Sequence, residues 1–470
     1  MGAISTLAEA INFNEDGLRL LISIMAGYPF GAIYRTFFYN KSPQIQHIYF
    51  IVTGVMIYLF NCGLDIYHTI LSIFIAYYLT NYMPKTKNFP FIVHGIFLGY
   101  LMVGYWFTES EEYDINWTTP YCIMVLRLIG LCLDVYDGTV DSKSLSGDAL
   151  KNNIKTPPGL VEIAAYSFYL PFTIVGPVIP LAYFREYVDG KHLTKSGNIR
   201  SSSLMVSVRR FLAGVVFAVF NQWGTFWVNN EYFNTPEFFN LPFHWKVIWT
   251  TIWYRSTFYK YACAWLLVEG SSILSGIGYT GKGEKGNDKW DGCRNISLKG
   301  FFFGSDYQSC VESFNINTNN WAKNHVFKRL RFLGNKLASQ ALTLFYLAVW
   351  HGYHLAYFLL FTYEMICMIS QDQFYKLIPR IPGMRDFLDK PYIKPLSWLF
   401  GKIVITLTMG FAFLPFGLIK KKYWIGPVLA QYAWGYILYI VIWPVIYHTL
   451  CKIFPKQKVD TEKKESKKEL

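Results

Sequence analysis

The sequence predicts an all-helical protein that crosses a membrane about eleven times, with re-entrant or broken segments around a buried reaction chamber. Composition is the first reason, because 53% of the 470 residues are hydrophobic and 16% are charged, whereas soluble domains carry about 25% charged residues. The second reason is a series of charge-poor runs that are long enough to span a bilayer as helices. The third is a group of prolines and glycines within one run, which a regular helix does not tolerate.

The runs that could cross a bilayer are spread over the whole chain. In order they are residues 18–38, 46–62, 64–82, 90–107, 119–136, 160–184, 204–225, 247–278, 338–363, 396–419 and 423–451. The run at 247–278 is long enough for one crossing or two. The run at 338–363 contains no Asp, Glu, Lys or Arg and is expected to form a membrane-spanning helix.

Residues 160–184 differ from the other runs in their helix-breaking residues. They contain Pro171, Gly176, Pro177 and Pro180. Proline removes a backbone hydrogen bond and clashes with the preceding turn, so a simple helix is excluded. Irregular backbone at membrane depth is tolerated only where it is buried in protein. We therefore expect a broken or re-entrant element here.

The net charge of +13 does not indicate nucleic-acid binding. The basic residues lie in short loops beside apolar runs, where the positive-inside bias and anionic lipid headgroups favour them. No nucleic-acid-binding module and no metal site are predicted. None of the eight cysteines forms a CxxC pair; Cys293 and Cys310 could pair in a lumenal stretch, and two free thiols are the favoured alternative.

The chain is predicted to be a single domain, residues 1–470, that ends in a cytosolic lysine-rich tail, residues 452–470. The last residues, KKEL, place Lys467 and Lys468 at the spacing of a cytosolic di-lysine retrieval signal. KKEL also resembles the lumenal signal KDEL. Both interpretations predict a multi-pass protein of the endoplasmic reticulum membrane.

The polar stretch between residues 279 and 337 contains SFNINTNNW, residues 313–321, and the charge-free run that follows contains WHGYH, residues 350–354. Buried amides need hydrogen-bond partners, so four asparagines at a bilayer edge form either helix caps and turns or a functional site. A histidine in a membrane helix is either an interhelical hydrogen-bonding residue or part of a site. His351 and His354 are three residues apart and would share one helix face.

Together these motifs resemble the membrane-bound O-acyltransferase family, in its lysophospholipid acyltransferase branch, and are most similar to the lysophosphatidylcholine acyltransferases. The resemblance covers residues 17 to about 365. Further stretches that agree are AGYPFGAIYR, LIGLCLDVYDG, YSFYLPFTIVGP, CAWLLVEGSSILSGIGYTG and KWDGC. The family member would transfer an acyl chain from acyl-coenzyme A, a substrate rather than a cofactor, to the free glycerol hydroxyl of a lysophospholipid, with lysophosphatidylcholine favoured.

The resemblance implies that Asn315 and His351 are the catalytic pair. A neutral imidazole can take the hydroxyl proton during attack on a thioester, and Asn315 could orient the imidazole or stabilise the oxyanion. Since a thioester is already activated, direct transfer without an acyl-enzyme is expected. His354 is expected to pack behind His351.

A basic run in the same stretch, Lys328, Arg329 and Arg331 with Lys336, could bind the phosphates of coenzyme A. An equally good interpretation is an amphipathic segment that faces lipid headgroups.

Other functions remain open at this point. Related branches acylate sterols, diacylglycerol or proteins, and a lipid transporter would also cross the membrane many times. Transporters often contain paired repeats with matching broken helices, but the sequence contains no second copy of the broken segment or of WHGYH. Protein partners are not predicted.

Overall fold

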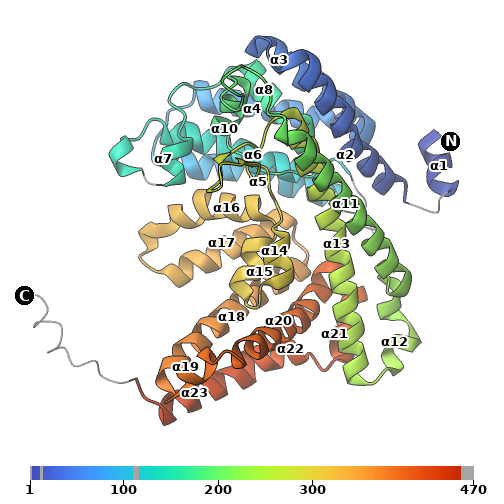
Figure 1. Cartoon of the computed structure of the whole chain (residues 1–470), viewed down its shortest axis with the longest axis vertical. Helices are drawn as coiled ribbons and strands as arrows, with labels where there is room; N and C mark the ends of the chain where they lie inside the picture. The colour runs from blue at the N-terminus through green and yellow to red at the C-terminus, as the bar shows by residue number, and fades with distance from the viewer. Residues whose placement is uncertain (1–2, 11–13, 110–115, 146, 457–470) are drawn as a thin grey trace, which may run out of the picture. The chain divides into compact units, whose positions relative to one another are not determined.

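The computed structural model describes residues 3–10, 14–109, 116–145 and 147–456, and almost all of its regular structure is helical (Figure 1). The chain packs as two compact units. Unit 1 consists of Met1–Trp227, Arg255–Phe301 and Val311–Tyr353, and unit 2 consists of Val228–Tyr254, Phe302–Cys310 and His354–Leu470. Helices α13 (Phe243–Ser275), α14 (Leu298–Phe303) and α15 (Tyr307–Ser313) pass from one unit into the other.

Unit 1 contains the first half of the chain and the segment that carries both motifs, SFN and WHG. Its helices are α1 (Ala3–Ala10), α2 (Glu15–Ile33), η1 (Tyr34–Phe38), α3 (Pro43–Cys62), η2 (Gly63–Asp65), α4 (Ile66–Asn81), α5 (Phe89–Thr108), α6 (Thr118–Asp137), η3 (Ser142–Ser144), α7 (Asp148–Asn152), α8 (Leu160–Ser167), α9 (Leu170–Thr173), α10 (Leu181–Val188), α11 (Ser202–Trp227), α16 (Ile316–His325), η5 (Phe327–Leu333) and α17 (Lys336–His351). Two short antiparallel strands, β1 (Gly281–Lys282) and β2 (Asp288–Lys289), pair Gly281 with Lys289.

Unit 2 contains the C-terminal helices. They are η4 (Glu231–Asn234), α12 (Pro236–Asn240), α18 (Leu355–Leu377), η6 (Ile378–Arg380), α19 (Met384–Asp389), α20 (Ile393–Leu418), α21 (Lys421–Ala430), α22 (Trp434–Tyr436), η7 (Ile437–Ile442) and α23 (Trp443–Ile453). Helix α18 packs on α20 and α23. The Tyr307 hydroxyl lies 2.6 Å from Thr408 Oγ1 and 2.5 Å from the Tyr439 hydroxyl, so a buried polar contact joins α15, α20 and η7.

Helix α6 lies at the centre of unit 1. In its most apolar 18-residue window 83% of the residues are buried, against 22% for α5 and for α11. Even the charged residues of α6, Arg127, Asp134 and Asp137, are buried. Helices α4, α5, α8 and α16 all pack against α6. Residues on α6 therefore contact several other helices of this unit.

The predicted interruption between residues 160 and 184 is confirmed. The segment folds as α8, the four-residue α9 and α10, which begins at Leu181 after Pro180. The buried Arg127 on α6, 1% exposed, donates hydrogen bonds to the Ser167 carbonyl at 3.1 Å and to the Tyr166 carbonyl. These carbonyls belong to the last turn of α8, where no intrahelical partner is available. A buried guanidinium thus satisfies the backbone that the break exposes.

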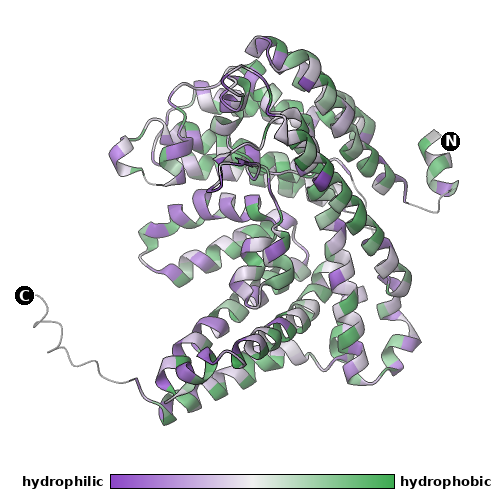
Figure 2. Ribbon diagram, in the orientation of Figure 1, coloured by the Kyte–Doolittle hydropathy of each residue, from purple (hydrophilic) through white to green (hydrophobic). Residues whose placement is uncertain are grey.

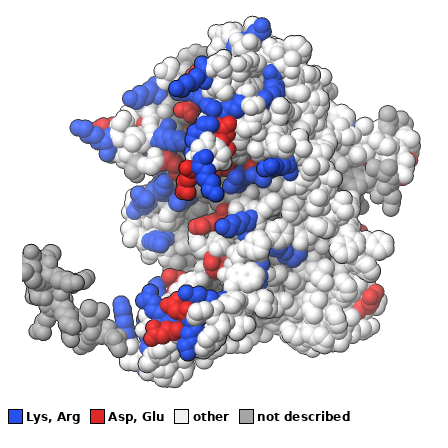
Figure 3. Space-filling view, in the orientation of Figure 1, with Lys and Arg blue, Asp and Glu red and all other residues white. Residues whose placement is uncertain are grey.

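Helix α11 has a continuous apolar surface on its outer side. In the hydropathy colouring α11 is mainly hydrophobic, whereas α16 is mainly hydrophilic (Figure 2). The exposed large side chains of α11 include Leu204, Met205, Val208, Leu212, Val219, Trp223 and Phe226. An exposed apolar stripe of this length suits contact with lipid chains. In Figure 3 wide areas of the visible face likewise carry no charged side chain, and Lys and Arg are interspersed with Asp and Glu elsewhere.

Among the described residues, seven helices are long and apolar enough to cross a membrane. They cover Glu15–Phe38, Pro43–Asn81, Phe89–Thr108, Thr118–Asp137, Ser202–Asn234, Ile393–Leu418 and Trp434–Ile453. A fold with several membrane helices is therefore confirmed, while the predicted number of eleven is not. The run at 247–278 forms one helix, α13, and all eight cysteines are free thiols.

One prediction about the run at 338–363 is wrong. Helix α17 ends at His351 and α18 begins at Leu355, so the run is two helices rather than one. Gly352 has φ 130° and ψ −176°, a conformation that side chains of L-residues rarely adopt and that no helix contains. His351 and His354 consequently do not share a helix face, and they belong to different units.

Candidate active site

Asn315 lies at the end of a short antiparallel pairing between residues 295–297 and 313–316. Ile296 forms an isolated bridge with Phe314, the Ser297 amide donates to the Ser313 carbonyl at 2.8 Å, and the Ile316 amide donates to the Asn295 carbonyl at 3.0 Å. Opposite residues of such a pair place their side chains on the same side. Asn295 and Asn315 are therefore neighbours, although 20 residues separate them.

Asn315 precedes α16 in the N-cap position, but it does not cap the helix. Its φ of 49° and ψ of 45° are left-handed, a conformation that asparagine tolerates better than most residues. Its side chain forms no cap hydrogen bond. Instead, Asn295 Oδ1 accepts from the Asn317 amide at 2.9 Å, and Asn295 Nδ2 donates to Asn315 Oδ1 at 3.3 Å. A residue distant in sequence thus caps α16 and contacts the predicted catalytic amide.

Two other asparagines of the motif have structural roles. Asn317 Nδ2 donates to the Arg294 carbonyl at 2.8 Å. Asn319 Nδ2 donates to the Val311 and Phe314 carbonyls, both at 2.9 Å. These bonds satisfy backbone groups around the turn before α16, so the cap-and-turn interpretation is confirmed for Asn317 and Asn319.

His351 is the last residue of α17 and is partly buried. Helix α17 begins after Asn335, whose side chain accepts from the Ala338 amide at 3.1 Å. The residue before His351 is held on two sides: Trp350 Nε1 donates to the Cys122 carbonyl at 2.9 Å, and the Trp350 carbonyl accepts from the Tyr105 hydroxyl at 3.1 Å. The backbone that carries the imidazole is therefore fixed to α6 and to α5.

The helices that carry Asn315 and His351 pack together within unit 1. The rings of Trp321 on α16 and Tyr346 on α17 are 6.0 Å apart. His94 on α5 joins this contact, with its Nδ1 3.0 Å from the Tyr346 hydroxyl and its ring 6.3 Å from that of Trp321. Aromatic contacts among three helices thus hold α16 beside α17 and α5.

The basic run lies on η5, and its members differ in their surroundings. Arg329 Nη2 is 2.7 Å from Asp137 Oδ2, and the Asp137 side chain is only 5% exposed. Lys328 Nζ is 3.7 Å from Asp148 Oδ2, whose side chain is 55% exposed. Arg331 is exposed. Arg329 therefore anchors η5 to α6, whereas Lys328 pairs with an exposed carboxylate and Arg331 is itself exposed.

His325, at the end of α16, is a buried group that the sequence did not indicate. Its Nε2 lies 3.8 Å from Asp134 Oδ1 on α6. Burial, followed by the positive charge of Arg329, holds the pKa of His325 well below its usual range. The imidazole is therefore neutral at physiological pH, and its contact with Asp134 is a packing contact rather than an ion pair. A lone His beside an Asn gives no sequence signal for such burial.

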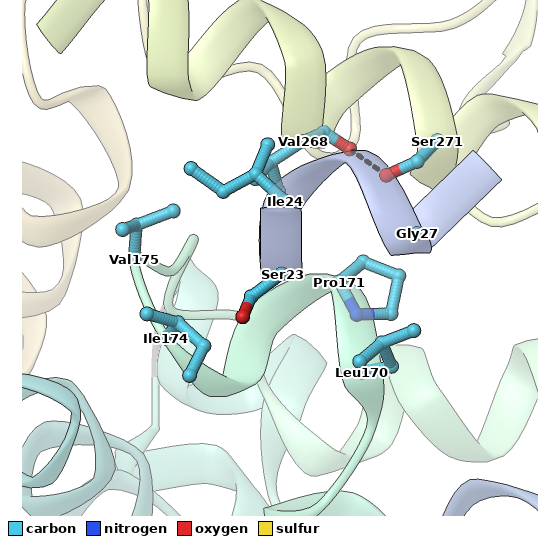
Figure 4. A pocket seen from close by; sticks show the side chains of 9 residues that line it. All are labelled: Ser23, Ile24, Gly27, Leu170, Pro171, Ile174, Val175, Val268 and Ser271. Atoms are coloured by element: carbon cyan, nitrogen blue, oxygen red, sulfur yellow. Dashed lines mark hydrogen bonds between the residues drawn. The ribbon is translucent and has the colours of Figure 1, made fainter. Parts of the chain in front are cut away.

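A small cavity in unit 1 lies away from the predicted catalytic residues. Side chains of α2, of the broken segment and of α13 line it: Ser23, Ile24, Gly27, Leu170, Pro171, Ile174, Val175, Val268 and Ser271 (Figure 4). Its two hydroxyls already donate within their own helices, Ser23 to the Arg19 carbonyl at 2.7 Å and Ser271 to the Val268 carbonyl at 3.1 Å. A small cavity with a mainly apolar lining and satisfied hydroxyls offers no group for acyl-transfer chemistry.

Residues 102–414 match MBOAT, the membrane-bound O-acyltransferase family. The chain belongs to this family. The matched region contains Asn315, His351, α6, α16, α17 and the end of α5 that carries Tyr105, and it confirms the family predicted from SFNINTNNW and WHGYH.

Curated relatives resemble the chain over almost its full length. A protein of Caenorhabditis elegans named lysophospholipid acyltransferase 5 is 49% identical over 473 residues, which cover 100% of both chains. Proteins of the same name are 34% identical in Drosophila melanogaster, over 96% of this chain and 91% of the relative, and 33% identical in humans, over 93% and 90%. The coverage includes the C-terminal third, where sequence motifs carried little information.

Proposed function

We propose that this member of the family acylates lysophospholipids to diacyl phospholipids. The observation that carries the proposal is the 49% identity, over the entire chain, to a protein named lysophospholipid acyltransferase 5. Asn315, which directly precedes α16, and His351, the last residue of α17, supply residue types that the chemistry needs, and α16 and α17 pack together in one unit. The finer proposal is that the donor is acyl-coenzyme A, the favoured acceptor is lysophosphatidylcholine and the location is the endoplasmic reticulum membrane.

His351 acts as the general base in this proposal. Neutral imidazole removes the proton of the glycerol hydroxyl while the hydroxyl oxygen attacks the thioester carbonyl carbon. The carbonyl π electrons move to oxygen and give a tetrahedral oxyanion. Collapse of this intermediate forms the ester, breaks the carbon–sulfur bond and releases the thiolate, which takes the proton from the imidazolium. No acyl-enzyme is needed, because the thioester is already activated.

The surroundings of His351 support a precise position for the base. Trp350 is tied to α6 and α5 by two hydrogen bonds, and the helix stops immediately after His351 at Gly352. A side chain on a fixed helix end can be held within the small tolerance that proton transfer requires.

The basic run is proposed to receive the phosphates of coenzyme A. Lys328 and Arg331 would contact the anion, because Arg331 is exposed and the carboxylate beside Lys328 is itself largely in solvent. Arg329 would act mainly by holding η5 against Asp137. Guanidinium and ammonium groups bind phosphate through charge-assisted hydrogen bonds.

An acyl-transfer assay on the purified full-length protein tests the proposed function. Lysophospholipids with several headgroups, diacylglycerol and a sterol would be offered with a panel of acyl-coenzyme A donors. We expect diacyl phospholipid from the lysophospholipids and the highest turnover with lysophosphatidylcholine. His351→Ala should lower turnover by about 100-fold to 10,000-fold, the usual effect of losing a positioned base.

The matched control is His354→Ala, which changes a nearby histidine in the other unit and should lose far less activity. Product formed only from a sterol or diacylglycerol would contradict the proposed acceptor. Lipid movement without diacyl product would indicate a transporter. Full turnover by a well-folded His351→Ala protein would remove His351 from the mechanism.

A further inference from the structure

Asn295 is a buried residue, 4% exposed, that no motif identified. Its amide has only one orientation compatible with its surroundings. The oxygen and nitrogen of an asparagine amide have the same shape, so hydrogen bonds must distinguish them. The backbone amide of Asn317 can only donate, and it lies 2.9 Å from one end of the Asn295 side chain, which must be the oxygen Oδ1.

The other end of Asn295 is therefore the donor Nδ2, and it lies 3.3 Å from the Asn315 amide. Asn315 must meet this donor with its own oxygen. The orientation of Asn315 follows: its Oδ1 is turned toward Asn295, and its Nδ2 is turned away from Asn295. A single backbone N–H thus determines the orientation of two side-chain amides in series.

The residue before Asn295 in the chain also makes a contact that positions this loop. The neighbouring Arg294 extends its Nε to within 3.8 Å of Glu269 Oε1, and Arg210 Nε lies 3.0 Å from the same oxygen. Glu269 lies on α13 and is 1% exposed. The contact of Arg294 with this buried carboxylate links the loop to α13.

We propose that Asn295 is a positioning residue that turns the Asn315 amide so that its Nδ2 group donates to the oxyanion of the tetrahedral intermediate. The inference rests on the proposed acyl transfer and goes beyond it, because it assigns a donor role to Asn315. Because the oxygen of Asn315 accepts from Asn295 and its Nδ2 is turned away, the group that Asn315 presents on the side away from Asn295 is a donor. Oxyanion stabilisation requires a donor that is already oriented when charge develops.

Asn295→Asp separates the positioning role from the capping role. A carboxylate of the same shape still accepts from the Asn317 amide and caps α16, because acidic residues are good N-caps. It has no hydrogen to donate to Asn315, whose amide would turn over and give its Nδ2 to the new carboxylate. We expect thermal stability within the range of the wild type, KM values for acyl-coenzyme A and lysophosphatidylcholine nearly unchanged, and kcat reduced at least about 10-fold.

Asn315→Asp tests the donor role independently of Asn295. Its carboxylate accepts from Asn295 Nδ2 as before but offers no donor to the oxyanion. Activity as low as that of Asn315→Ala supports the donor role, and activity near the wild type would show that Asn315 acts as an acceptor and would overturn the proposal. Asn320→Asp, the same change at an exposed position of α16, is the matched control and should remain active.

The double variant Asn295→Asp with Asn315→Ala shows whether Asn295 acts through Asn315. In that case the double variant is no slower than Asn315→Ala alone, whereas independent effects would multiply and contradict the proposal.

A wild-type kcat in Asn295→Asp would also overturn the proposal. If Asn295→Asp is unstable, Asn315→Asp decides the outcome. Suppose that His351→Ala and Asn315→Ala are inactive while Asn295→Asp is fully active. The proposed function would then stand, and only the role of Asn295 would be disproved.

Discussion

At the scale of single residues, the ion pair between Arg329 and Asp137 separates two roles within one basic run. Asp137 is buried, and its carboxylate lies 2.7 Å from the guanidinium. Removing one partner of a buried pair leaves an unpaired charge, which costs roughly 3 to 5 kcal/mol of stability. Arg331, by contrast, is exposed on the same element, so its replacement should leave the fold intact.

The first prediction compares Arg329→Gln with Arg331→Gln. We expect Arg329→Gln to lower the temperature at which the detergent-solubilised protein loses its monodisperse state, because Asp137 loses its partner. Arg331→Gln should keep that temperature and raise the apparent KM for acyl-coenzyme A more than the KM for lysophospholipid. Equal changes in both KM values for Arg331→Gln would indicate a general effect at the membrane surface instead of phosphate binding.

His325 provides a prediction about pH. Burial and Arg329 hold its folded-state pKa well below the value of about 6.5 expected in the unfolded chain. Between these two values the unfolded chain binds a proton that the folded protein does not, so stability falls as the pH decreases below about 6.5. We expect His325→Gln to show a smaller loss of thermal stability between pH 7.5 and pH 5.5 than the wild type. Identical losses in both proteins would mean that His325 is not held neutral by the fold.

Prediction from sequence succeeded for residues within motifs and failed for their partners. SFN and WHG indicated Asn315 and His351 through a family resemblance, and the family is confirmed; their catalytic roles stay predictions. The sequence did not indicate a functional role for Asn295, because asparagine is common in turns of every kind. Its importance arises from a pairing with residues 313–316 that only the folded chain creates.

At the scale of elements, the break between α17 and α18 depends on one residue. Gly352, at φ 130°, ends the helix directly after His351. Alanine at this position would have to adopt a conformation reserved for glycine, or the helix would continue and turn His354 onto the face of His351.

Replacing Gly352 by alanine tests how much the break depends on this residue. We predict lower turnover together with lower thermal stability, because either strain or a longer helix displaces the imidazole. Gly99→Ala on α5 is the matched control: a Cβ there would meet nothing within 4 Å, and alanine favours a helix. An active and stable Gly352→Ala protein would show that the break tolerates a side chain.

Two irregular segments show what local sequence can predict about elements. Pro171, Pro177 and Pro180 predicted the interruption of residues 160–184, because each proline removes a backbone donor. Gly352 stands alone in an apolar run, and a single glycine is compatible with a membrane helix. The helix–helix break at Gly352 was therefore missed, since apolar composition gave the stronger signal.

At the scale of the whole molecule, the prediction of the protein's cellular location rests on residues that the structure does not describe. Lys467 and Lys468 lie in the tail at 457–470, outside the described residues. If the tail faces the cytosol, changing both lysines to serine should release a tagged protein from the endoplasmic reticulum to later compartments, which microscopy with organelle markers would detect. Retention of the doubly substituted protein would show that another segment determines its location.

The membrane-helix architecture was predictable, because it follows from the apolar, charge-poor composition of the chain. An apolar chain with few charges must place its helices in lipid, and seven described helices meet the length and composition that this requires. The division into two compact units had no sequence signal at α13, because the boundary between Tyr254 and Arg255 lies inside that helix, where no glycine or proline marks it.

The contact between α3 and the broken segment limits how this chain can vary. A Cβ placed on Gly54 would lie 1.8 Å from the carbonyl oxygen of Phe168, the residue that follows α8. Backbone meets backbone there, so no rotamer change can make room. Any side chain at position 54 would push the interrupted segment away from α3. Among functional sequence variants of this protein we therefore expect position 54 to remain glycine while the lipid-facing residues around it vary.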